Sequence, residues 1–258
     1  MITLASDFGS AYPAAMKGVI LSKCDARLID VAHDFPRQDV RAAAFWLRET
    51  LPYFPPAVHL AVIDPGVGTD RRAVVLRVGD HVLVGPDNGV LKPAARRIAA
   101  EYDDEPSLEA YKIDVENPDS TTFHGRDVFA PAAADAHEVG ADALDTIERF
   151  VPIECSSLAD YSFPDPERDD DSVTGEVLVV DDFGNCITNI PGADVRPFER
   201  IAVNGEPTPV GDTFEAVLRG SRLVTVGSHG YVECDVNHGR GDEAFGLSAG
   251  DTVRLDFD

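Results

Sequence analysis

The chain has 258 residues, of which 44% are hydrophobic and 26% are charged. This composition is typical of a globular protein with a sizeable core, and it excludes a chain that is disordered throughout. The 22 basic and 46 acidic residues give a net charge of −24 at pH 7, so nucleic acid and anionic membranes are poor partners. No stretch of the sequence approaches the roughly 20 apolar residues that a membrane-spanning helix needs.

The charged residues are strongly biased in type. Asp outnumbers Glu, and the only lysines are Lys17, Lys23, Lys92 and Lys112. This composition resembles that of proteins from salt-loving archaea, where high ionic strength screens the repulsion between acidic groups. An acidic interaction tail is the weaker alternative, because the acids are spread along the chain. Residues 1–13 lack the basic and apolar regions of a signal peptide, so we expect a cytoplasmic protein.

The cysteines indicate neither a zinc ribbon nor a dense disulfide framework, because they lie far apart and form no Cys-x-x-Cys pair. They are Cys24, Cys155, Cys186 and Cys234. We therefore expect buried, reduced thiols. Nothing in the sequence suggests an organic cofactor, and no HExxH motif or clustered set of ligands indicates a metal.

Short apolar runs alternate with helical spacing in the first part of the chain, which predicts an N-terminal α/β domain with a mostly parallel sheet. We predict strands over residues 2–5, 27–31, 58–63, 73–78 and 82–84. Helices are predicted over residues 14–22, 40–51, 93–101 and 126–137. The strands are apolar throughout, as expected when helices cover both faces of a sheet. Gly79-Asp80 fits a two-residue hairpin turn, so we expect an antiparallel element as well.

The composition of the sequence changes at residues 162–172, SFPDPERDDDS, which combine two prolines with a run of acids. We interpret this segment as a linker between an N-terminal domain, residues 1–161, and a C-terminal domain, residues 173–258. Six short strands follow, predicted over residues 175–180, 186–190, 201–203, 222–226, 231–236 and 252–255. Asn204-Gly205 is a strong hairpin signal. This pattern predicts a small all-β sandwich or barrel.

Polar residues follow the apolar runs at the edge where an α/β sheet binds its ligands. The segments are SDFG at 6–9, DVAH at 30–33, DPGVGTDRR at 64–72, GPDNG at 85–89 and TFHGRD at 122–127. Each has a purely structural explanation when taken alone. Asp7 can form a turn or cap a helix, and His33 and His124 can be interior histidines with their hydrogen bonds satisfied. Arg126 and Asp127 can form an internal ion pair. Asp87-Asn88-Gly89 can simply form a turn. Together the segments predict a polar cluster at one edge of the sheet.

In order, the motifs SDFG, DVAH, VIDPGVGTDRR, GPDNGVL, TFHGRDVFAPAAA and VDDFGNCITNI resemble those of the S-adenosyl-L-methionine (SAM) hydrolases, or SAM hydroxide adenosyltransferases. These enzymes are relatives of the fluorinase and chlorinase. The resemblance extends over essentially the whole chain. It implies an N-terminal α/β domain, a C-terminal β-barrel and a homotrimer that binds SAM between the N-terminal domain of one subunit and the C-terminal domain of its neighbour.

The resemblance also implies roles for individual residues. The family's catalytic residues fall on Asp64, Arg71 and His124, and the acid that holds the ribose hydroxyls falls on Asp7. The other substrate-binding residues that it implies are Asp181, Asn185, Ser228 and Glu233. Asp181 and Asn185 match the segment that contacts the methionine amino group and the adenine. SAM is then the substrate and adenosine a product, with no cofactor and no metal.

Two departures from the halogenating relatives favour water over halide as the nucleophile. Those enzymes carry a tyrosine where this chain has Asp64, and they differ at the position of His124. They also have an extra loop where Arg71 leads directly into the predicted strand 73–78. We therefore expect in-line attack of water on C5′ of SAM, with Asp64 or His124 as the proton acceptor and the (R)-sulfonium epimer as candidate substrate. A SAM-dependent halogenase and a non-catalytic adenosine or SAM sensor are the alternatives.

Overall fold

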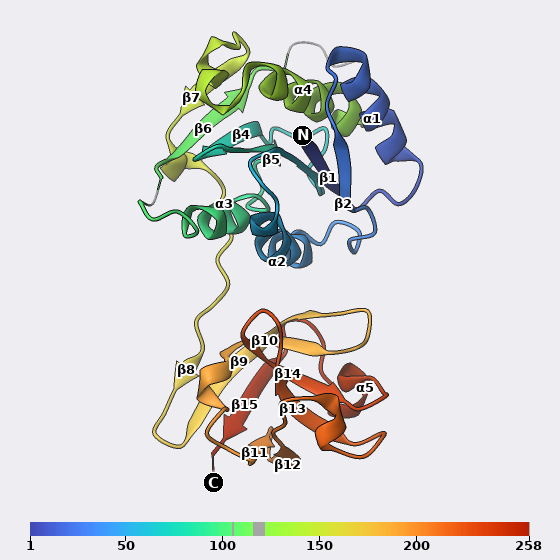
Figure 1. The fold of residues 1–258 in the computed structure, drawn as a ribbon, viewed down its shortest axis with the longest axis vertical. Helices are drawn as coiled ribbons and strands as arrows, with labels where there is room; N and C mark the ends of the chain where they lie inside the picture. Colours follow the sequence, from blue (N-terminus) through green and yellow to red (C-terminus); the bar gives the residue numbers. More distant parts are fainter. Residues whose placement is uncertain (105, 116–121, 258) are drawn as a thin grey trace. The chain divides into compact units, whose positions relative to one another are not determined.

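The structure is a computed structural model that describes residues 1–104, 106–115 and 122–257. The chain divides into two compact units, Met1–Tyr161 and Ser162–Asp258, and each has its own sheet (Figure 1). Among the residues described, no helix is both long enough and apolar enough to cross a membrane.

The first unit contains a seven-stranded sheet of order β2-β1-β3-β5-β4-β6-β7. Its strands are β1 (Ile2–Ser6), β2 (Leu28–Ala32), β3 (Val58–Val62), β4 (Ala73–Val78), β5 (His81–Pro86), β6 (Leu108–Ile113) and β7 (Phe150–Ile153). The pairs among β2, β1, β3 and β5 are parallel, whereas β4, β6 and β7 add antiparallel pairs. The predicted α/β domain with an antiparallel element is thus confirmed, and its sheet is mixed, with the parallel strands β2, β1, β3 and β5 as its core. Gly79, with φ +54°, turns the β4–β5 hairpin as predicted, while β6 and β7 were not predicted.

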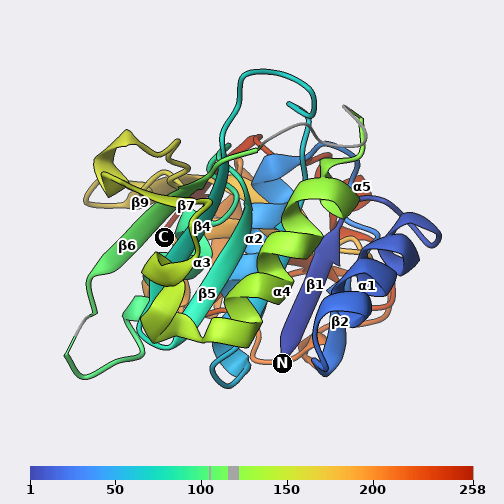
Figure 2. The ribbon, with the colours of Figure 1, turned by 90° about the horizontal axis from the view of Figure 1, so that it is seen from above.

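Helices cover both faces of this sheet, as the continuous apolar strands indicate. They are α1 (Tyr12–Lys23), α2 (Val40–Thr50), α3 (Lys92–Ala99) and α4 (Ala130–Val139), with short turns η1 (Leu51–Tyr53), η3 (Ala141–Thr146) and η4 (Cys155–Ser157). Figures 1 and 2 show α1 and α4 on one face of the sheet and α2 and α3 on the other. On the first face, Met16 and Ile20 of α1 pack with Leu4 and Leu60 in the main hydrophobic core.

The second unit is an antiparallel sheet of order β12-β11-β15-β9-β10-β14-β13, with β8 paired to β9. Its strands are β8 (Glu167–Arg168), β9 (Ser172–Val180), β10 (Cys186–Pro191), β11 (Arg200–Val203), β12 (Glu206–Pro209), β13 (Arg222–Val226), β14 (Tyr231–Val236) and β15 (Thr252–Asp256). Short helical turns are η5 (Gly192–Asp194), η6 (Phe214–Ala216) and α5 (Gly241–Phe245). A bridge between Val210 and Val224 joins the two ends of the sheet, which makes a nearly closed barrel. The predicted all-β domain is therefore a barrel.

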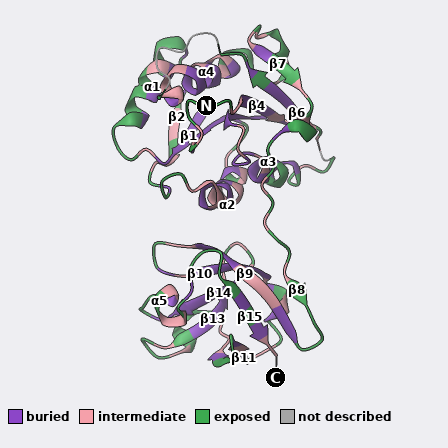
Figure 3. Ribbon diagram, turned by 180° about the vertical axis from the view of Figure 1, so that it is seen from behind, coloured by how far each residue is buried: buried purple, intermediate pink, exposed green. Residues whose placement is uncertain are grey.

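Local sequence explains two features of the barrel. Asn204 and Gly205 have φ values of +49° and +84° and turn the β11–β12 hairpin, as their sequence predicts. Figure 3 shows buried positions along the strands of the barrel, and its hydrophobic core includes Val177, Val224 and Val253. The acidic segment 162–172 contributes the two-residue strand β8 to this unit.

The four cysteines are free. Cys24, Cys186 and Cys234 are buried, as expected, whereas Cys155 is half-buried and donates a hydrogen bond from Sγ to Leu108 O at 3.0 Å. Burial raises the pKa of the Cys186 thiol to about 12 and that of Cys234 well above its ordinary value. The two core thiols of the barrel are therefore protonated at neutral pH.

The sheet of the first unit determines where its polar loops meet. The strands β1, β3 and β5 run parallel, so their carboxyl ends lie at one edge. Asp7 follows β1, Asp64 comes two residues after β3, and Asp87 follows β5. The antiparallel strand β4 begins at this same edge, directly after Arg71 and Arg72. Side chains that are distant in the sequence are thereby brought together.

Candidate active site

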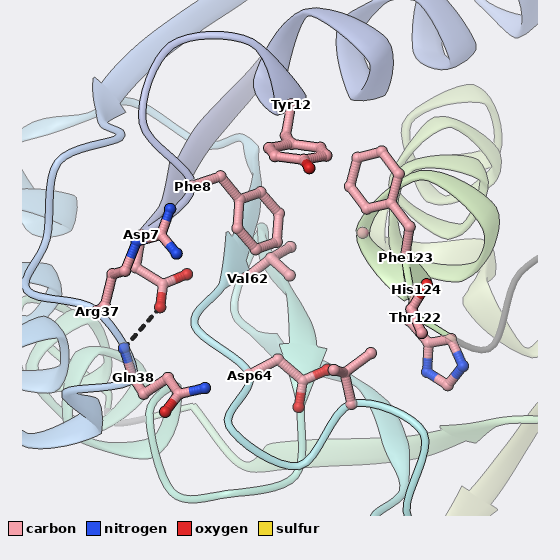
Figure 4. Close-up of a pocket in the computed structure, with 12 residues that line it drawn as sticks. Asp7, Phe8, Tyr12, Arg37, Gln38, Val62, Asp64, Thr122, Phe123 and His124 are labelled. Atoms are coloured by element: carbon pink, nitrogen blue, oxygen red, sulfur yellow. Dashed lines mark hydrogen bonds between the residues drawn. The ribbon is translucent and has the colours of Figure 1, made fainter.

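A cavity of about 370 Å³ opens at this edge of the sheet. Its walls include Asp7, Asp64 and His124, which are three of the predicted site residues (Figure 4). The loops that follow β1 and β3 supply the two carboxylates, and the segment before α4 supplies the imidazole. This cavity lies where ligands collect in α/β sheets.

Asp64, Arg71 and His124 form one hydrogen-bonded chain. Arg71 donates from Nε to Asp64 Oδ1 at 2.8 Å and from Nη2 to Asp64 Oδ2, a bidentate ion pair. The same Nη2 lies 2.9 Å from His124 Nδ1. The side chains of Asp64 and Arg71 are only 4% and 10% exposed. Asp64 and His124 line the cavity, and the largely buried Arg71 contacts both.

The guanidinium of Arg71 is also held against a ring. Its Cζ atom lies 5.0 Å from the centroid of the fully buried Phe129, a cation–π contact that stabilises the guanidinium at this position. Phe129 ends a π-helical turn, Gly125–Phe129, that starts immediately after His124 and continues into α4. The helix expected over residues 126–137 is thus π-helical in its first turn, and such turns are frequent at functional sites.

Gly125 is required by the packing at this point. A Cβ atom there would lie 2.9 Å from Met16 Sδ and 3.0 Å from the ring of Phe8. The absence of a side chain lets the segment with His124 approach α1 closely. Arg126 and Asp127, the next two residues, form the predicted internal ion pair, with Arg126 Nε 2.5 Å from Asp127 Oδ1.

The hydrogen bond from Arg71 determines the tautomer of His124. An arginine side chain only donates, so Nδ1 of His124 accepts and the proton of the neutral ring resides on Nε2. Burial, together with the positive charge of Arg71, lowers the pKa of His124 below its ordinary value of 6.5. His124 is therefore neutral at pH 7, with Nε2–H as its remaining donor.

Asp7 is held by the backbone of the loop that precedes α2. Its Oδ2 accepts a hydrogen bond from Gln38 N at 2.7 Å, and Gln38 adopts the left-handed conformation with φ +61°. Arg37 and Gln38 lie beside Asp7 in the cavity wall (Figure 4). Neither was predicted, because a left-handed Gln in a loop has no recognisable sequence signal.

Three aromatic rings make an apolar wall. Tyr12 and Phe123 meet edge to face with centroids 5.2 Å apart, and Phe8 lies 5.9 Å from Phe123 and 6.1 Å from Tyr12 (Figure 4). All three line the cavity. They were not among the predicted site residues, although Phe8 follows Asp7 directly and Phe123 directly precedes His124. Adjacency to candidate polar residues was the signal that could have identified them.

His33 has the structural role that a lone histidine suggests. Its Nδ1 lies 2.8 Å from Ser6 Oγ and its Nε2 lies 3.0 Å from Asp30 Oδ1. Its carbonyl oxygen accepts a hydrogen bond from Gly9 N at 2.8 Å. His33 therefore stabilises the turn that contains Asp7.

Two predicted site residues of the second unit organise the turn between β9 and β10. Asp181 Oδ1 accepts from the backbone N–H groups of Phe183 at 2.9 Å and Asn185 at 2.8 Å. Its Oδ2 accepts from Asn185 Nδ2 at 3.0 Å. These bonds leave Phe183 at the tip of the turn, 79% exposed. Asp181 and Asn185 are thus brought into direct contact.

The other two predicted residues of this unit lie on the β13–β14 hairpin. Ser228 is exposed in its turn, whereas Glu233 is buried on β14, opposite Ile187 of β10. Glu233 Oε1 lies 3.5 Å from His229 Nδ1. A Cβ atom on Gly227 would lie 1.7 Å from the same Oε1, so glycine at 227 makes room for this carboxylate. Within the described ranges, no group of three or more His, Cys, Asp or Glu side chains could hold a metal ion.

Comparison with known proteins identifies the family. The model of the SAM hydroxide adenosyltransferase N-terminal domain matches residues 2–146, and that of the C-terminal domain matches residues 175–254. The (R)-S-adenosyl-L-methionine hydrolases of Salinispora tropica and Thermus thermophilus are each 41% identical to this chain over 263 residues. These alignments cover 98% and 97% of this chain and 97% of each relative.

Solved structures agree with this result. A conserved protein from Thermotoga maritima superposes with a TM-score of 0.80 at 33% identity, over 99% of this chain and 100% of its own. A second conserved protein, from Thermus thermophilus, gives a TM-score of 0.76 at 36% identity, over 98% of both chains. The chain therefore belongs to the SAM hydroxide adenosyltransferase family.

Proposed function

We propose that this protein hydrolyses SAM to adenosine and L-methionine and that it acts on the (R)-sulfonium epimer. The observation that carries the proposal is the chain from Asp64 through Arg71 to His124 in the wall of a cavity that also contains Asp7. Relatives named (R)-S-adenosyl-L-methionine hydrolases, 41% identical over nearly the full length, support the substrate.

The chemistry requires an activated and well-placed water. The sulfur of SAM is a sulfonium, so methionine leaves as a neutral thioether and needs no general acid. The water oxygen forms a bond to C5′ while the C5′–S bond breaks and its electron pair stays on sulfur. One proton of the water must be lost during or just after this attack. Alignment at near-attack distance and proton transfer are therefore the enzyme's two tasks.

The hydrogen-bond geometry divides these tasks between Asp64 and His124. Arg71 occupies Nδ1 of His124, so this ring offers Nε2–H as a donor that orients the nucleophile. Asp64 accepts only from Arg71 in the bonds described above, and its carboxylate keeps lone pairs for the water. We therefore assign Asp64 as the proton acceptor. Arg71 positions the side chains of Asp64 and His124, and it places a positive charge near the developing hydroxide.

This arrangement supplies the electrostatic help that a metal would otherwise give. The guanidinium of Arg71 is nearly buried, so its charge acts in a medium of lower dielectric than water. We propose on this basis that the reaction is metal-independent. The expected result is full activity in the presence of a chelator.

Substrate binding is assigned to the remaining predicted residues. A carboxylate such as Asp7 can bind the two ribose hydroxyls, and the aromatic wall offers an apolar surface. We further propose that Asp181, Asn185, Ser228 and Glu233 bind the methionine and adenine ends. The family's motif residues are divided between the two units, which supports the homotrimer with shared sites that the sequence resemblance implies.

The proposed setting is a salt-rich cytoplasm. The net charge of −24 supports this setting, because high ionic strength screens the repulsion between the acidic groups. We further propose that the chain is organised as two domains, residues 1–161 and 173–258, joined by the acidic linker at residues 162–172.

A single-turnover experiment tests the activity. The protein is incubated with each SAM epimer in ¹⁸O-water, molar KCl and a chelator, and the nucleoside is identified by mass spectrometry. Adenosine that carries ¹⁸O at its 5′ position is expected from the (R) epimer. A 5′-chloro product would instead identify a halogenase, and bound but unchanged SAM would identify a sensor.

Matched variants locate the activity in the cavity. Asp64→Asn should abolish most turnover, because the amide has almost the same shape as the carboxylate but cannot accept the proton. Asp135→Asn is the control, since Asp135 lies on α4, pairs with Arg149 and Lys23 and is not in the cavity wall. Equal activity of the two variants would contradict the assignment of Asp64.

A further inference from the structure

Asp87 and Asn88, which follow β5, contact both ends of the loop that carries the proposed catalytic pair. This loop, residues 64–71, starts after Ile63 and ends before Arg72, and we call it the catalytic loop. Asn88 donates from Nδ2 to Ile63 O at 2.8 Å. Asp87 Oδ2 accepts from Arg72 Nε at 2.7 Å and lies 2.5 Å from Arg72 Nη2. The two adjacent side chains therefore hold the residues that flank the loop.

On its far side the catalytic loop is held by Arg71, which contacts His124 and Phe129. Its backbone hydrogen bonds, Val67 N to Asp64 O at 3.3 Å and Thr69 N to Gly66 O at 3.1 Å, each span only three residues. Residues 67–70 are exposed. Such local bonds shape the loop without fixing its position relative to the sheet. Its position relative to the sheet therefore depends on these contacts of Arg71 and on the anchors at its two ends.

The anchors themselves are well fixed. The side chain of Asp87 is only 6% exposed, and its second oxygen, Oδ1, accepts from Ala159 N at 2.8 Å. Asp87 N also donates to Arg72 O at 2.9 Å. Asn88 Oδ1 accepts from Val90 N at 3.2 Å, which turns its amide toward Ile63. One oxygen of Asp87 thus faces two nitrogens of Arg72 while the other is held by Ala159 N, and both ends of the Asn88 amide are engaged, so these contacts are geometrically specific.

We propose that Asp87 and Asn88 are positioning residues that hold the catalytic loop so that Asp64 and Arg71 meet in their bidentate geometry. They act through Ile63 and Arg72 and touch neither the cavity nor the reacting atoms. The inference rests on the proposed function, in which Asp64 and Arg71 serve hydrolysis. A displacement of about 1 Å at a reacting group lowers the rate by about 10²-fold. The anchors therefore affect the rate through geometry.

Two isosteric substitutions test the anchors one at a time. Asn88→Asp keeps the acceptor for Val90 N but removes the donor to Ile63 O. Asp87→Asn keeps the shape but removes the charge that pairs with Arg72. We expect kcat to fall about 10- to 100-fold in each variant, while the dissociation constant for SAM changes less than about threefold. The pH profile of kcat should shift, because the pairing among Asp64, Arg71 and His124 is loosened.

The control removes a comparable ion pair from the same unit. Asp135→Asn loses the pairs with Arg149 and Lys23 and should lower the melting temperature while kcat and its pH profile stay unchanged. Losses of kcat that simply follow melting temperature in all three variants would overturn the proposal. So would an unchanged kcat in Asp87→Asn and Asn88→Asp.

A double variant separates this inference from the proposed function. Adding Asp87→Asn to Asp64→Asn should lower the residual rate less than threefold. Asp87 is proposed to act by positioning Asp64 against Arg71, so its effect should be small once the Asp64 carboxylate is gone. Multiplicative losses would show an independent effect and overturn the positioning role. If Asp64→Asn alone keeps full activity, the assignment of Asp64 fails. If it is inactive but the anchor variants are fully active, only the positioning role fails.

Discussion

His59 and His81 contact each other edge to edge in the interior of the first unit, with ring planes 12° apart and His59 Nε2 2.9 Å from His81 Nδ1. Thr3 Oγ1 lies 2.8 Å from the other nitrogen of His59. His59 is 1% and His81 6% exposed. Burial lowers the pKa of His59 from 6.5 to about 3 and also lowers the pKa of His81. Both rings are therefore uncharged in the folded protein near neutral pH.

This pair predicts a loss of stability in acid. Between pH 6.5 and 3 the unfolded chain binds a proton at His59 that the folded chain does not, so the free energy of unfolding falls as pH falls. The decrease is about 1.4 kcal/mol per pH unit for one such group, or roughly 3 kcal/mol between pH 6.5 and 4.5. His59→Gln should reduce this slope in denaturant titrations. An unchanged slope would show that His59 already titrates normally in the fold.

Asp235 predicts the opposite dependence in the barrel. It is fully buried, Thr225 Oγ1 donates to its Oδ2 at 2.5 Å, and its Oδ1 has no partner among the described residues. Burial raises its pKa from 3.8 to about 7. Between these values the folded chain keeps a proton that the unfolded chain has released, so stability falls as pH rises from 3.8 to 7.

Asp235→Asn removes this titration at nearly constant shape. Relative to the parent, the variant should gain stability between pH 4 and 7.5, by up to about 4 kcal/mol at the upper end. Thermal unfolding at several pH values measures the difference. Asp256→Asn, at a partly exposed position on β15, is the control and should show no such trend. A constant difference for Asp235→Asn would rule out a raised pKa.

Variants of the cavity should separate turnover from binding. Asp64→Ala and His124→Ala should lower kcat by about 10²–10⁴, the usual contribution of acid–base help, and leave SAM affinity within a few-fold. Asp7→Asn keeps an acceptor for Gln38 N but loses the charge offered to the ribose, so it should weaken SAM binding about 10-fold or more. Isothermal titration and initial rates give both quantities. Equal effects of the three variants on affinity would contradict these roles.

Mixed oligomers test the proposed sharing of the site. Asp64→Ala and Asn185→Ala should each be inactive alone. If each site uses Asp64 from one subunit and Asn185 from another, mixing the two after partial dissociation should restore part of the activity. Native mass spectrometry establishes that mixed trimers form. Mixed trimers without activity would place Asp64 and Asn185 of each site in one subunit.

The net charge predicts a dependence on salt. With −24 charges on 258 residues, self-repulsion opposes folding and assembly at low ionic strength. The Debye length falls from about 10 Å at 0.1 M to about 3 Å at 1 M salt. The melting temperature and the fraction of the protein in the proposed trimer should therefore rise between 0.1 M and about 3 M KCl. A flat response would remove the argument for a salt-rich setting and leave the proposed activity untouched.

Strands could be predicted from the sequence where burial alone determines which residue types occur. The strands β1, β3 and β5 are buried on both faces and read as continuous apolar runs. The strand β6 was missed because Glu109 and Lys112 interrupt its pattern, and Glu109 forms an ion pair with Arg77 of β4. The strand β12 contains Pro207 and Pro209, which argue against a strand except at a sheet edge, where it lies.

The site was predictable to the extent that its residues follow strands. Asp64 and Asp7 come after strand ends, so topology brings them to one edge. The bond from Asn88 to Ile63 joins residues 25 positions apart, and no local pattern encodes such a contact. The left-handed Gln38 that holds Asp7 depends on the surrounding loop in the same way. Tertiary packing determines these contacts.

The bond from Ala159 N to Asp87 Oδ1 affects how the chain can be divided into fragments. Arg72 also donates from Nη1 to Ser157 Oγ at 3.1 Å, and Arg96 Nη1 donates to Tyr161 O at 3.2 Å. A fragment that stops before residue 157 would remove the bond of Asp87 Oδ1 to Ala159 N and that of Arg72 Nη1 to Ser157, and would leave Asp87 and Arg72 with only each other. An isolated first unit must therefore extend through Tyr161 to retain the native environment of its catalytic loop.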